Sequence, residues 1–599
     1  MPPEVTAAVV AALSPRLRKR LDAAVEKLAA RPVTCDGGIC RIAVDDETFV
    51  ELHAPGGTVA AEGGIRCGCL LAPACVHRAA AATLAPIADD TSTPAPSDAP
   101  DQPPLPAPDE ADATAPLTGP TEEGASAPTT APSGTPAQAA AAEALWQAAV
   151  PVLDAGVDGA GAVLQAALLR AAHTARLAAL PRPAAAAIRT VNGLRAARAA
   201  EPDHRTAELA DALEELLATA YGLRRPGTPD AHAALRGTAR RAYTPGGSLR
   251  LYGLFAEPVL TATGHAGVVT WTVDSAGRLY TVPDVAPGGP VRARNAGDRA
   301  VRMGDTALTH RDLARAGLVV SGATVSPDGR LGAGRSVRAA AAAGADWTEE
   351  PLASLWSVPV ADQAARVLAA GAAGPDLLFL DATLTGVARE AGGDCLLAEC
   401  AGLTVRLTAA DDHPELAHRE NLALLATAPG TRFRAIARLV PAAHPRAALL
   451  AVRLPTGRHD LGLDRLQRQD VPPTSPLPDP ARAPSPVRPT PSAPLHILRR
   501  RTEQVVVAGR RALTHAAPAR PHTAAPHPEA PDSALLRRAG LSTAAELLDA
   551  LRGSAAERGR DGFGRLVAAD TDAFARAWLA TARYLDEAST ALCREAWRT

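Results

Sequence analysis

The chain has 599 residues, a length that indicates several domains because single hydrophobic cores stop growing well below it. Hydrophobic residues make up 47% but aromatic residues only 3%, so the cores must be built from Ala, Leu and Val. The formal net charge of −2 excludes a polycation that binds nucleic acid through its overall field. The chain shows neither a signal-peptide pattern nor a run of about 18 apolar residues, so we expect a cytoplasmic protein with no membrane partner.

Residues 1–88 carry both helix and strand patterns. Ser14 and Pro15 are a favoured N-cap and first helical residue, and they predict a helix that continues to Pro32. Alternating apolar residues predict short strands over 40–44 and 49–54, and a third strand over 58–67. A second helix is expected from Pro73, ending before Pro86.

The rest of the chain divides by composition. Residues 89–138 are rich in Pro, Ala and acidic residues and poor in large apolar ones, which predicts a disordered linker. Apolar residues at helical spacing predict a helical region over 139–245, and period-2 patterns predict a β-rich region over 246–470. Short strands with polar turns favour a small barrel or sandwich for that β-rich region, an oligonucleotide-binding type of barrel being one option.

The C-terminal part begins with a second linker, the Pro-rich residues 471–494. A basic segment and closing helices are expected over 495–599. The glycines and alanines of 328–344 lack the Lys-Ser/Thr ending of a phosphate loop, and we expect a turn entering a helix there. No internal repeat is evident in the sequence.

A cluster of three cysteines and one histidine stands out between Cys67 and His77. Three thiols and one imidazole are a complete tetrahedral ligand set for Zn²⁺. Cys67 and Cys69 share one face of an extended segment, because side chains alternate along a strand. Cys75 and His77 cannot share an ion inside a regular helix, so we expect them to straddle a helix start. The four residues therefore predict one structural Zn²⁺ site without an open coordination position.

The alternatives to zinc are free thiols or a disulfide. Three cysteines leave one unpaired, and a bridge between Cys67 and Cys69 would be strained in so small a ring. Clustered thiols in a cytoplasmic protein also favour metal over disulfides. Cys35 and Cys40 lie in the same region, but one ion needs only four ligands, and we interpret them as buried or loop thiols.

The order C-x-C…C-x-H resembles the SWIM zinc finger, and Cys67, Cys69, Cys75 and His77 match its four ligands in order. The resemblance covers about residues 33–88, and the long Ala-rich remainder is similar to extensions of actinobacterial proteins that carry this finger. It implies zinc binding within a small ββ(β)α domain, and it implies DNA or protein binding as a function. The spacer Leu70–Ala74 is short for this family, which leaves little room for a recognition loop.

Candidate nucleic-acid contacts follow from local basic residues. Near the zinc ligands they are Arg16, Arg18, Lys19, Arg20, Arg66 and Arg78. A second group comprises Arg499–Arg501, Arg510 and Arg511. The scarcity of aromatic residues disfavours base stacking, so such contacts would go mainly to phosphates.

The sequence thus predicts an α+β multidomain protein: a zinc-finger domain over 1–88, an Ala-rich helical region, a β-rich region and C-terminal helices, joined by disordered linkers. No nucleophile elbow, zincin or kinase signature is present, so we expect no enzyme activity and no small-molecule substrate. The first hypothesis is a zinc-finger protein that binds DNA or another nucleic acid through a local basic surface. The alternative is a protein–protein adaptor that docks onto a partner such as a helicase-type ATPase.

Overall fold

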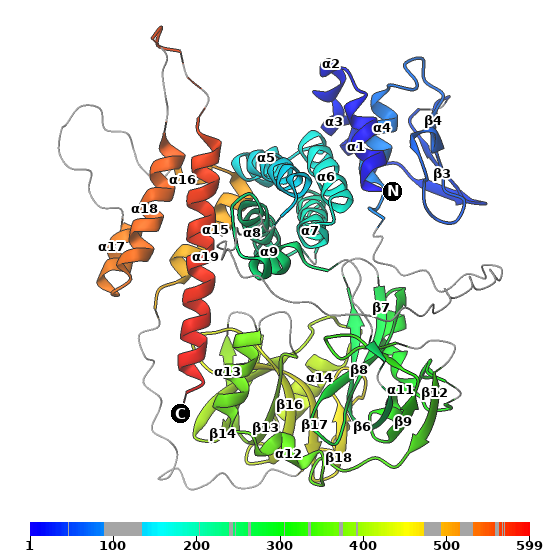
Figure 1. Cartoon of the computed structure of the whole chain (residues 1–599), viewed down its shortest axis with the longest axis vertical. Helices are drawn as coiled ribbons and strands as arrows, with labels where there is room; N and C mark the ends of the chain where they lie inside the picture. Colours follow the sequence, from blue (N-terminus) through cyan, green and yellow to red (C-terminus); the bar gives the residue numbers. More distant parts are fainter. Residues whose placement is uncertain are drawn as a thin grey trace, which may run out of the picture. The chain divides into compact units, whose positions relative to one another are not determined.

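The computed structural model shows a mixed α+β chain that divides into two compact units (Figure 1). The first unit comprises residues 1–239 and 496–583, and the second comprises 240–495 and 584–599. The structure describes residues 1–88, 134–238, 244–472, 493–514 and 531–598, except 46, 203, 246, 262–264, 305, 333–336, 371–374, 391–392, 558–561, 566 and 568. The two linkers predicted over 89–138 and 471–494 lie mostly outside the described residues.

The first unit begins with a four-stranded antiparallel sheet in the order β1-β2-β3-β4, with helices packed on one face (Figure 1). Ile42, Val50 and Ile65 point into the core between this sheet and the helices. The elements are α1 (Pro3–Ala11), α2 (Pro15–Arg18), α3 (Leu21–Ala29), β1 (Val33–Asp36), β2 (Ile39–Ala43), β3 (Phe49–His53), η1 (Glu62–Gly64), β4 (Ile65–Cys67) and α4 (Val76–Leu84).

This region differs from the sequence prediction in three ways. The helix expected from Ser14 to Pro32 is split into α2 and α3, which allows Leu21 to become fully buried. The third strand is confined to Ile65–Cys67, and β1 and α1 were not predicted. The prediction for Cys35 and Cys40 as thiols is wrong: they face each other across β1 and β2 and form a disulfide.

Helices make up the rest of the first unit. Their shared core is rich in Ala and Leu, as the composition requires, with Trp146 and Trp578 as its largest side chains. The N-terminal set is α5 (Pro136–Gly159), α6 (Ala162–Leu177), α7 (Pro181–Arg198), α8 (Thr206–Leu223) and α9 (Pro229–Arg236). The C-terminal set is α15 (His496–Ala508), α16 (Arg511–Thr514), α17 (Pro531–Arg538), α18 (Ser542–Ala556) and α19 (Thr571–Ala596).

Helix α5 already begins at Pro136, inside the predicted linker, because Thr135 and Gln138 form a capping box at its start. Helix α15 packs against α5 within the first unit, where the Cβ that Gly156 lacks would fall 2.3 Å from the backbone nitrogen of Gly509. The last turns of α19 belong to the second unit, where Cys593 and Trp597 are buried.

The second unit holds two modules with the same strand plan. In module A (residues 248–342), three strands form an antiparallel meander, and a fourth returns to pair with the first and with a fifth. The elements of the unit up to residue 342 are β5 (Thr244–Pro245), β6 (Ser248–Leu260), β7 (His265–Val273), β8 (Leu279–Pro287), α10 (Pro290–Arg294), η2 (Ala296–Asp298), α11 (His310–Leu313), β9 (Gly317–Ser321), β10 (Thr324–Val325), β11 (Leu331–Gly332) and β12 (Arg338–Ala342).

Module B (residues 377–460) repeats this plan, and its fifth strand also pairs in parallel with its third, so the pairings of five strands run in a closed circuit. A linking segment with α12 (Ala353–Ser357) and α13 (Val360–Ala370) precedes it. Its elements are β13 (Leu377–Glu390), β14 (Gly393–Cys400), β15 (Leu403–Ala409), α14 (His418–Leu425), β16 (Arg432–Leu439), β17 (Arg446–Leu454) and β18 (Gly457–Asp460).

The two modules also share a short sequence at the helix before the fourth strand. Leu308-Thr-His310-Arg-Asp312 precedes β9, and Leu416-Ala-His418-Arg-Glu420 precedes β16. Both histidines are buried. The sequence alone shows no convincing repeat here, because the likeness between the modules lies in their topology and in only a few residues. The helix expected within 328–344 is wrong: its alanines form β12, which pairs with β9.

Candidate metal centre

The four predicted ligands come together at one point of the first unit. The Sγ atoms of Cys67, Cys69 and Cys75 and a ring nitrogen of His77 all lie within 4.8 Å of one another. Cys75 is buried, and the other three side chains are half-buried. Donor atoms this close together could hold one tetrahedral Zn²⁺ ion, whose ligands bind at about 2.0–2.3 Å.

The local fold explains how four residues within eleven positions converge. Strand β4 ends on Cys67, and the chain then turns, so that Cys69 lies in the loop after the strand. Cys75 is the extended N-cap residue of α4, and His77 lies in the first turn of that helix. The prediction that Cys75 and His77 straddle a helix start is confirmed.

The thiols differ in their protonation. Burial raises the pKa of Cys67 to about 12 and also raises the pKa of Cys75. Burial opposes ionisation of Cys69 too, but hydrogen bonds from the Leu71 backbone and from the Cys75 and Cys67 thiols lower its pKa below the usual value. Among the three thiols, Cys69 is therefore the one that loses its proton most readily. A divalent cation that replaces the thiol protons fits this donor set.

Arg78 is the best-defined residue next to the ligands, and the structure places it in the protein interior. Its side chain is only 7% exposed. Its guanidinium donates to the carbonyl oxygens of Ile65 at 2.6 Å, Glu62 at 2.5 Å and Pro73. Ile65 and Pro73 each lie two residues before a cysteine ligand. Arg78 therefore holds together the two ligand arms, which are the strand end that carries Cys67 and the helix start that carries Cys75. Because its guanidinium is used in this way, we withdraw Arg78 from the candidate nucleic-acid contacts.

The other basic candidates have different surroundings. Arg16, Lys19 and Arg20 are exposed, and Arg66 lies on the exposed face of β4. Arg18 is half-buried and donates to the carbonyl oxygen of Ala11 at 2.5 Å. Lys27 and Arg31, which sequence analysis did not single out, line a small crevice that also contains His77.

In the second basic group, Arg499–Arg501 with Arg510 and Arg511, three arginines form ion pairs with acidic residues. Arg501 pairs with Asp532 at 2.6 Å, Arg510 pairs with Asp154 at 2.7 Å, and Arg511 pairs with Asp158 at 2.6 Å. Arg510 is almost fully buried. The Arg501 pairing joins α15 to α17, and the Arg510 pairing joins the segment after α15 to α5. This group therefore offers a weaker phosphate-binding surface than its sequence predicts.

The loop between the ligand pairs carries a feature that its sequence did not predict. Leu70 is fully exposed and Leu71 is 62% exposed. Exposed Phe49 lies beside the start of this loop, because its carbonyl oxygen accepts a hydrogen bond from the Gly68 backbone at 3.4 Å. The short spacer therefore presents apolar side chains to solvent next to the metal ligands.

Comparisons with known proteins give no further information on this site. No family model matches the chain, and neither do any curated protein or solved structure. Among the described residues, no helix combines the length and the apolar character needed to cross a membrane. The evidence for the candidate metal centre is therefore the geometry of its four residues.

Proposed function

We propose that residues 1–88 form a SWIM-type zinc module in which Cys67, Cys69, Cys75 and His77 hold one Zn²⁺. The convergence of a complete Cys₃His set within 4.8 Å supports this proposal. Three thiolates and a neutral imidazole leave a net charge of −1 and no open position, which favours a structural ion over a catalytic one. Within the chain, Arg78 would keep the two ligand arms at the spacing that the ion requires.

The zinc proposal is tested by metal analysis of the purified full-length chain. We expect one zinc per chain, and we expect the joint replacement Cys67→Ser and Cys69→Ser to abolish binding. Replacing Cys395→Ser and Cys400→Ser together is the matched control, because these buried cysteines lie in the second unit. Zinc content well below one per chain, or content that survives loss of Cys67 and Cys69, would contradict the proposal.

We further propose that the zinc module is a non-catalytic docking module for a protein partner. The exposure of Leu70 and Leu71 carries this proposal, since covering exposed apolar side chains with a partner lowers the free energy of the complex. Exposed Arg66 lies next to Cys67, so the partner segment is expected to combine apolar and acidic side chains. A helicase-type ATPase is the candidate that the resemblance to SWIM fingers suggests.

The docking surface is tested by binding of a purified helicase-type candidate to the full-length protein. We expect Leu70→Ser with Leu71→Ser to keep the zinc and to weaken binding at least about tenfold. Leu535→Ser is the control, because Leu535 is exposed on α17, away from the zinc loop. Equal affinity of the Leu70/Leu71 variant and the wild type would remove this surface from consideration.

Nucleic-acid binding is the second candidate function, supported by the exposed Arg16, Lys19 and Arg20 of the segment around α2. If these residues contact phosphates, the affinity for DNA falls steeply with salt concentration. Replacing all three with Gln would reduce that salt dependence by about one phosphate contact per residue. A DNA affinity that does not change with this replacement would exclude the surface.

For module B, we propose that the closed circuit of strands is a small barrel of the oligonucleotide-binding type. Two features support this interpretation: the circuit β14-β13-β16-β17-β15, and the position of α14 between β15 and β16 along the chain. The outward residues of β14 and β15 include both Glu399 and Arg406, so the charge on this face does not favour nucleic acid. The proposed barrel therefore assigns a fold class to module B, but it does not indicate what this module binds.

A further inference from the structure

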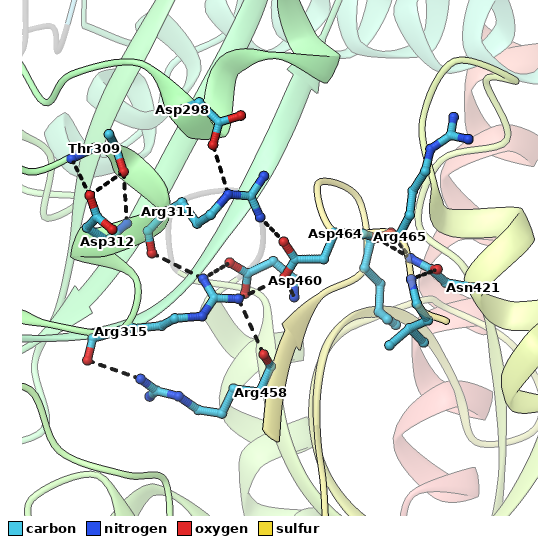
Figure 2. Close-up of polar contacts among 12 residues, drawn as sticks. Asp298, Thr309, Arg311, Asp312, Arg315, Asn421, Arg458, Asp460, Asp464 and Arg465 are labelled. Carbon is cyan, nitrogen blue, oxygen red and sulfur yellow. Dashed lines mark hydrogen bonds and ion pairs between the residues drawn. The ribbon is translucent and has the colours of Figure 1, made fainter. Parts of the chain in front are cut away.

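A shallow cavity of about 920 Å³, wide open to solvent, lies in the second unit, where module A meets module B. One wall comes from α11 and the residues that follow it, and the opposite wall comes from β18 and the loop after it (Figure 2). The lining contains four arginines, Arg311, Arg315, Arg458 and Arg465, together with His459. Its volume is in the range of small-molecule sites, which often lie at such junctions.

Two aspartates hold the first pair of arginines in fixed positions (Figure 2). Asp464 accepts from both Arg311 and Arg315, and Arg315 also lies 3.5 Å from the buried Asp460. The Asp464 carboxylate is fixed in turn by the backbone N–H of Asp460 at 2.9 Å. Asn421 binds the carbonyl oxygen of Asp464 at 2.6 Å, which anchors the loop to α14. The cavity wall is therefore built in advance of any ligand.

Arg458 differs from these two arginines because it has no carboxylate partner. Its guanidinium donates to the carbonyl oxygens of Ala345 at 3.3 Å and Arg315 at 3.2 Å. Among the residues that the structure describes, no carboxylate lies within 4.0 Å of it, although Asp460 attracts it over a longer distance. Burial lowers the pKa of Arg458, which shows that its charge is poorly solvated. An anion in the cavity would supply the missing partner.

Two further groups on the same wall can still form a hydrogen bond or an ion pair with a ligand. Arg465 pairs with Glu420 at 3.3 Å, its one acidic partner among the described residues, and both side chains are more than half exposed, so this pair exchanges readily with water or a ligand. The buried Nε2 atom of His459 has no hydrogen-bond partner among the described residues. The Asp312 carboxylate, in contrast, is occupied by Thr309 in the capping box of α11. The groups on this wall that remain open to a ligand are thus the Arg465 guanidinium and a ring nitrogen of His459, whose pKa is lowered by burial so that the ring stays neutral.

We propose that this cavity binds a phosphate group through Arg458 and Arg465, with Arg315 and His459 as neighbouring donors. Guanidinium groups match phosphate oxygens in charge and geometry. Leu308, Ala316 and Leu463 add an apolar part to the lining, which suits the organic body of a phosphate ester. This site is independent of the zinc module, and it adds a small-molecule ligand that the sequence did not indicate.

The test uses the full-length, zinc-loaded protein with three probes in calorimetry: inorganic phosphate, adenosine 5′-monophosphate and adenosine, at equal ionic strength in chloride. Both phosphate probes are expected to bind, and adenosine is not. Tighter binding of the monophosphate than of phosphate would assign an ester as the ligand, and equal binding would assign free phosphate. Absence of binding by both phosphate probes would overturn the proposal.

Variants tie the binding to the cavity. Arg458→Gln is expected to weaken phosphate binding at least about tenfold, and Arg458→Lys to restore only part of it because the fork of donors is lost. Arg465→Gln changes an exposed residue, so it reports on binding even if Arg458→Gln impairs folding. Arg389→Gln is the control, because Arg389 is an exposed arginine of module B outside the cavity. Wild-type affinity in both Arg458→Gln and Arg465→Gln would place any phosphate binding elsewhere and refute the site.

Discussion

Arg78 shows how a single buried cation can organise a candidate metal site without being one of its ligands. Its three acceptors belong to η1, to β4 and to the loop before α4. Hydrogen bonds from a charged donor to buried carbonyl groups are stronger than neutral ones. The guanidinium therefore fixes the distance between Cys67 and Cys75, and through it the shape of the ligand set.

Replacing Arg78→Ala is expected to lower the zinc affinity by about 10- to 100-fold, the range typical of residues that orient metal ligands. The carbonyl oxygens of Glu62, Ile65 and Pro73 would lose their donor, and the segments that carry Cys67 and Cys75 would separate. The affinity is measured by competition with a chromophoric chelator. Arg66→Ala is the matched control, because it removes the same charge from an exposed neighbour of Cys67 and should leave the affinity unchanged. An equal loss in both variants would mean that charge, not positioning, matters.

At this scale, the sequence predicts the ligands but not their surroundings. The spacing of Cys67, Cys69, Cys75 and His77 is local, so the convergence of these residues follows from a strand end and a helix start. The role of Arg78 depends on carbonyl groups up to 16 residues away, which no local pattern reveals. The exposure of Leu70 and Leu71 also depends on tertiary contacts, because a leucine pair in a short loop is equally compatible with burial.

The first strands of the two modules carry a glycine at the same kind of irregularity. The pairing of β6 shifts between Gly253 and Phe255, and that of β13 shifts between Leu384 and Gly386. At Gly253, an added Cβ would fall 1.8 Å from the carbonyl oxygen of Leu313. At Gly386, no atom lies within 4 Å of such a Cβ. Only the first glycine is required by close packing, in this case against the end of α11.

Gly253→Ala is therefore expected to destabilise module A by ~2 kcal/mol or more, because the new methyl group would push β6 away from α11. Gly386→Ala places the same group on the equivalent strand of module B, where it has room, and should change stability by less than ~0.5 kcal/mol. Thermal unfolding of both variants measures the difference. Similar losses in the two variants would show that the bulge itself, and not the contact with α11, requires glycine.

Elements with a clear period were predictable from the sequence, and ambiguous ones were not. The alternating residues of β7, β8 and β16 predict strands because one face is buried. The alanine run of β12 has no alternation and a high helix propensity, yet it forms a strand because β9 offers a free edge. The shared plan of modules A and B is likewise invisible in sequence, since five strand pairings can be made by many different residues.

At the scale of the whole molecule, the proposed zinc site lies in the first unit. If the ion supplies part of the folding free energy of residues 1–88, its removal acts there. Chelation is expected to speed amide hydrogen exchange in β3, β4 and α4, where the ligands and their supports lie. Peptides from modules A and B should exchange as before. If the amides of β4 and α4 exchange at the same rate before and after proven zinc loss, the fold of this region does not need the metal.

The stability of the second unit is expected to decrease in acid, because His310 and His418 are both buried in neutral form. Desolvation lowers the pKa of His310 to about 4 and that of His418 to about 4, from 6.5. Asp284 and Arg299 act on His310, and Asp411 and Arg438 act on His418, with smaller effects. Above pH 6.5 the folded and unfolded chains both carry neutral histidine, and below it the unfolded chain binds protons first.

Stability that these residues contribute is therefore complete above pH 6.5 and is lost as the pH falls towards 4, by up to ~3 kcal/mol for each histidine. We expect the unfolding temperature of the second unit to fall over this range, and to fall less steeply in His310→Gln and in His418→Gln. Calorimetry of the zinc-loaded chain between pH 7.5 and about 4.5 compares these slopes, which are informative even if a variant is less stable throughout. An unchanged slope in both variants would mean that the two histidines are protonated at little cost, and that the acid sensitivity of the unit comes from its buried carboxylates.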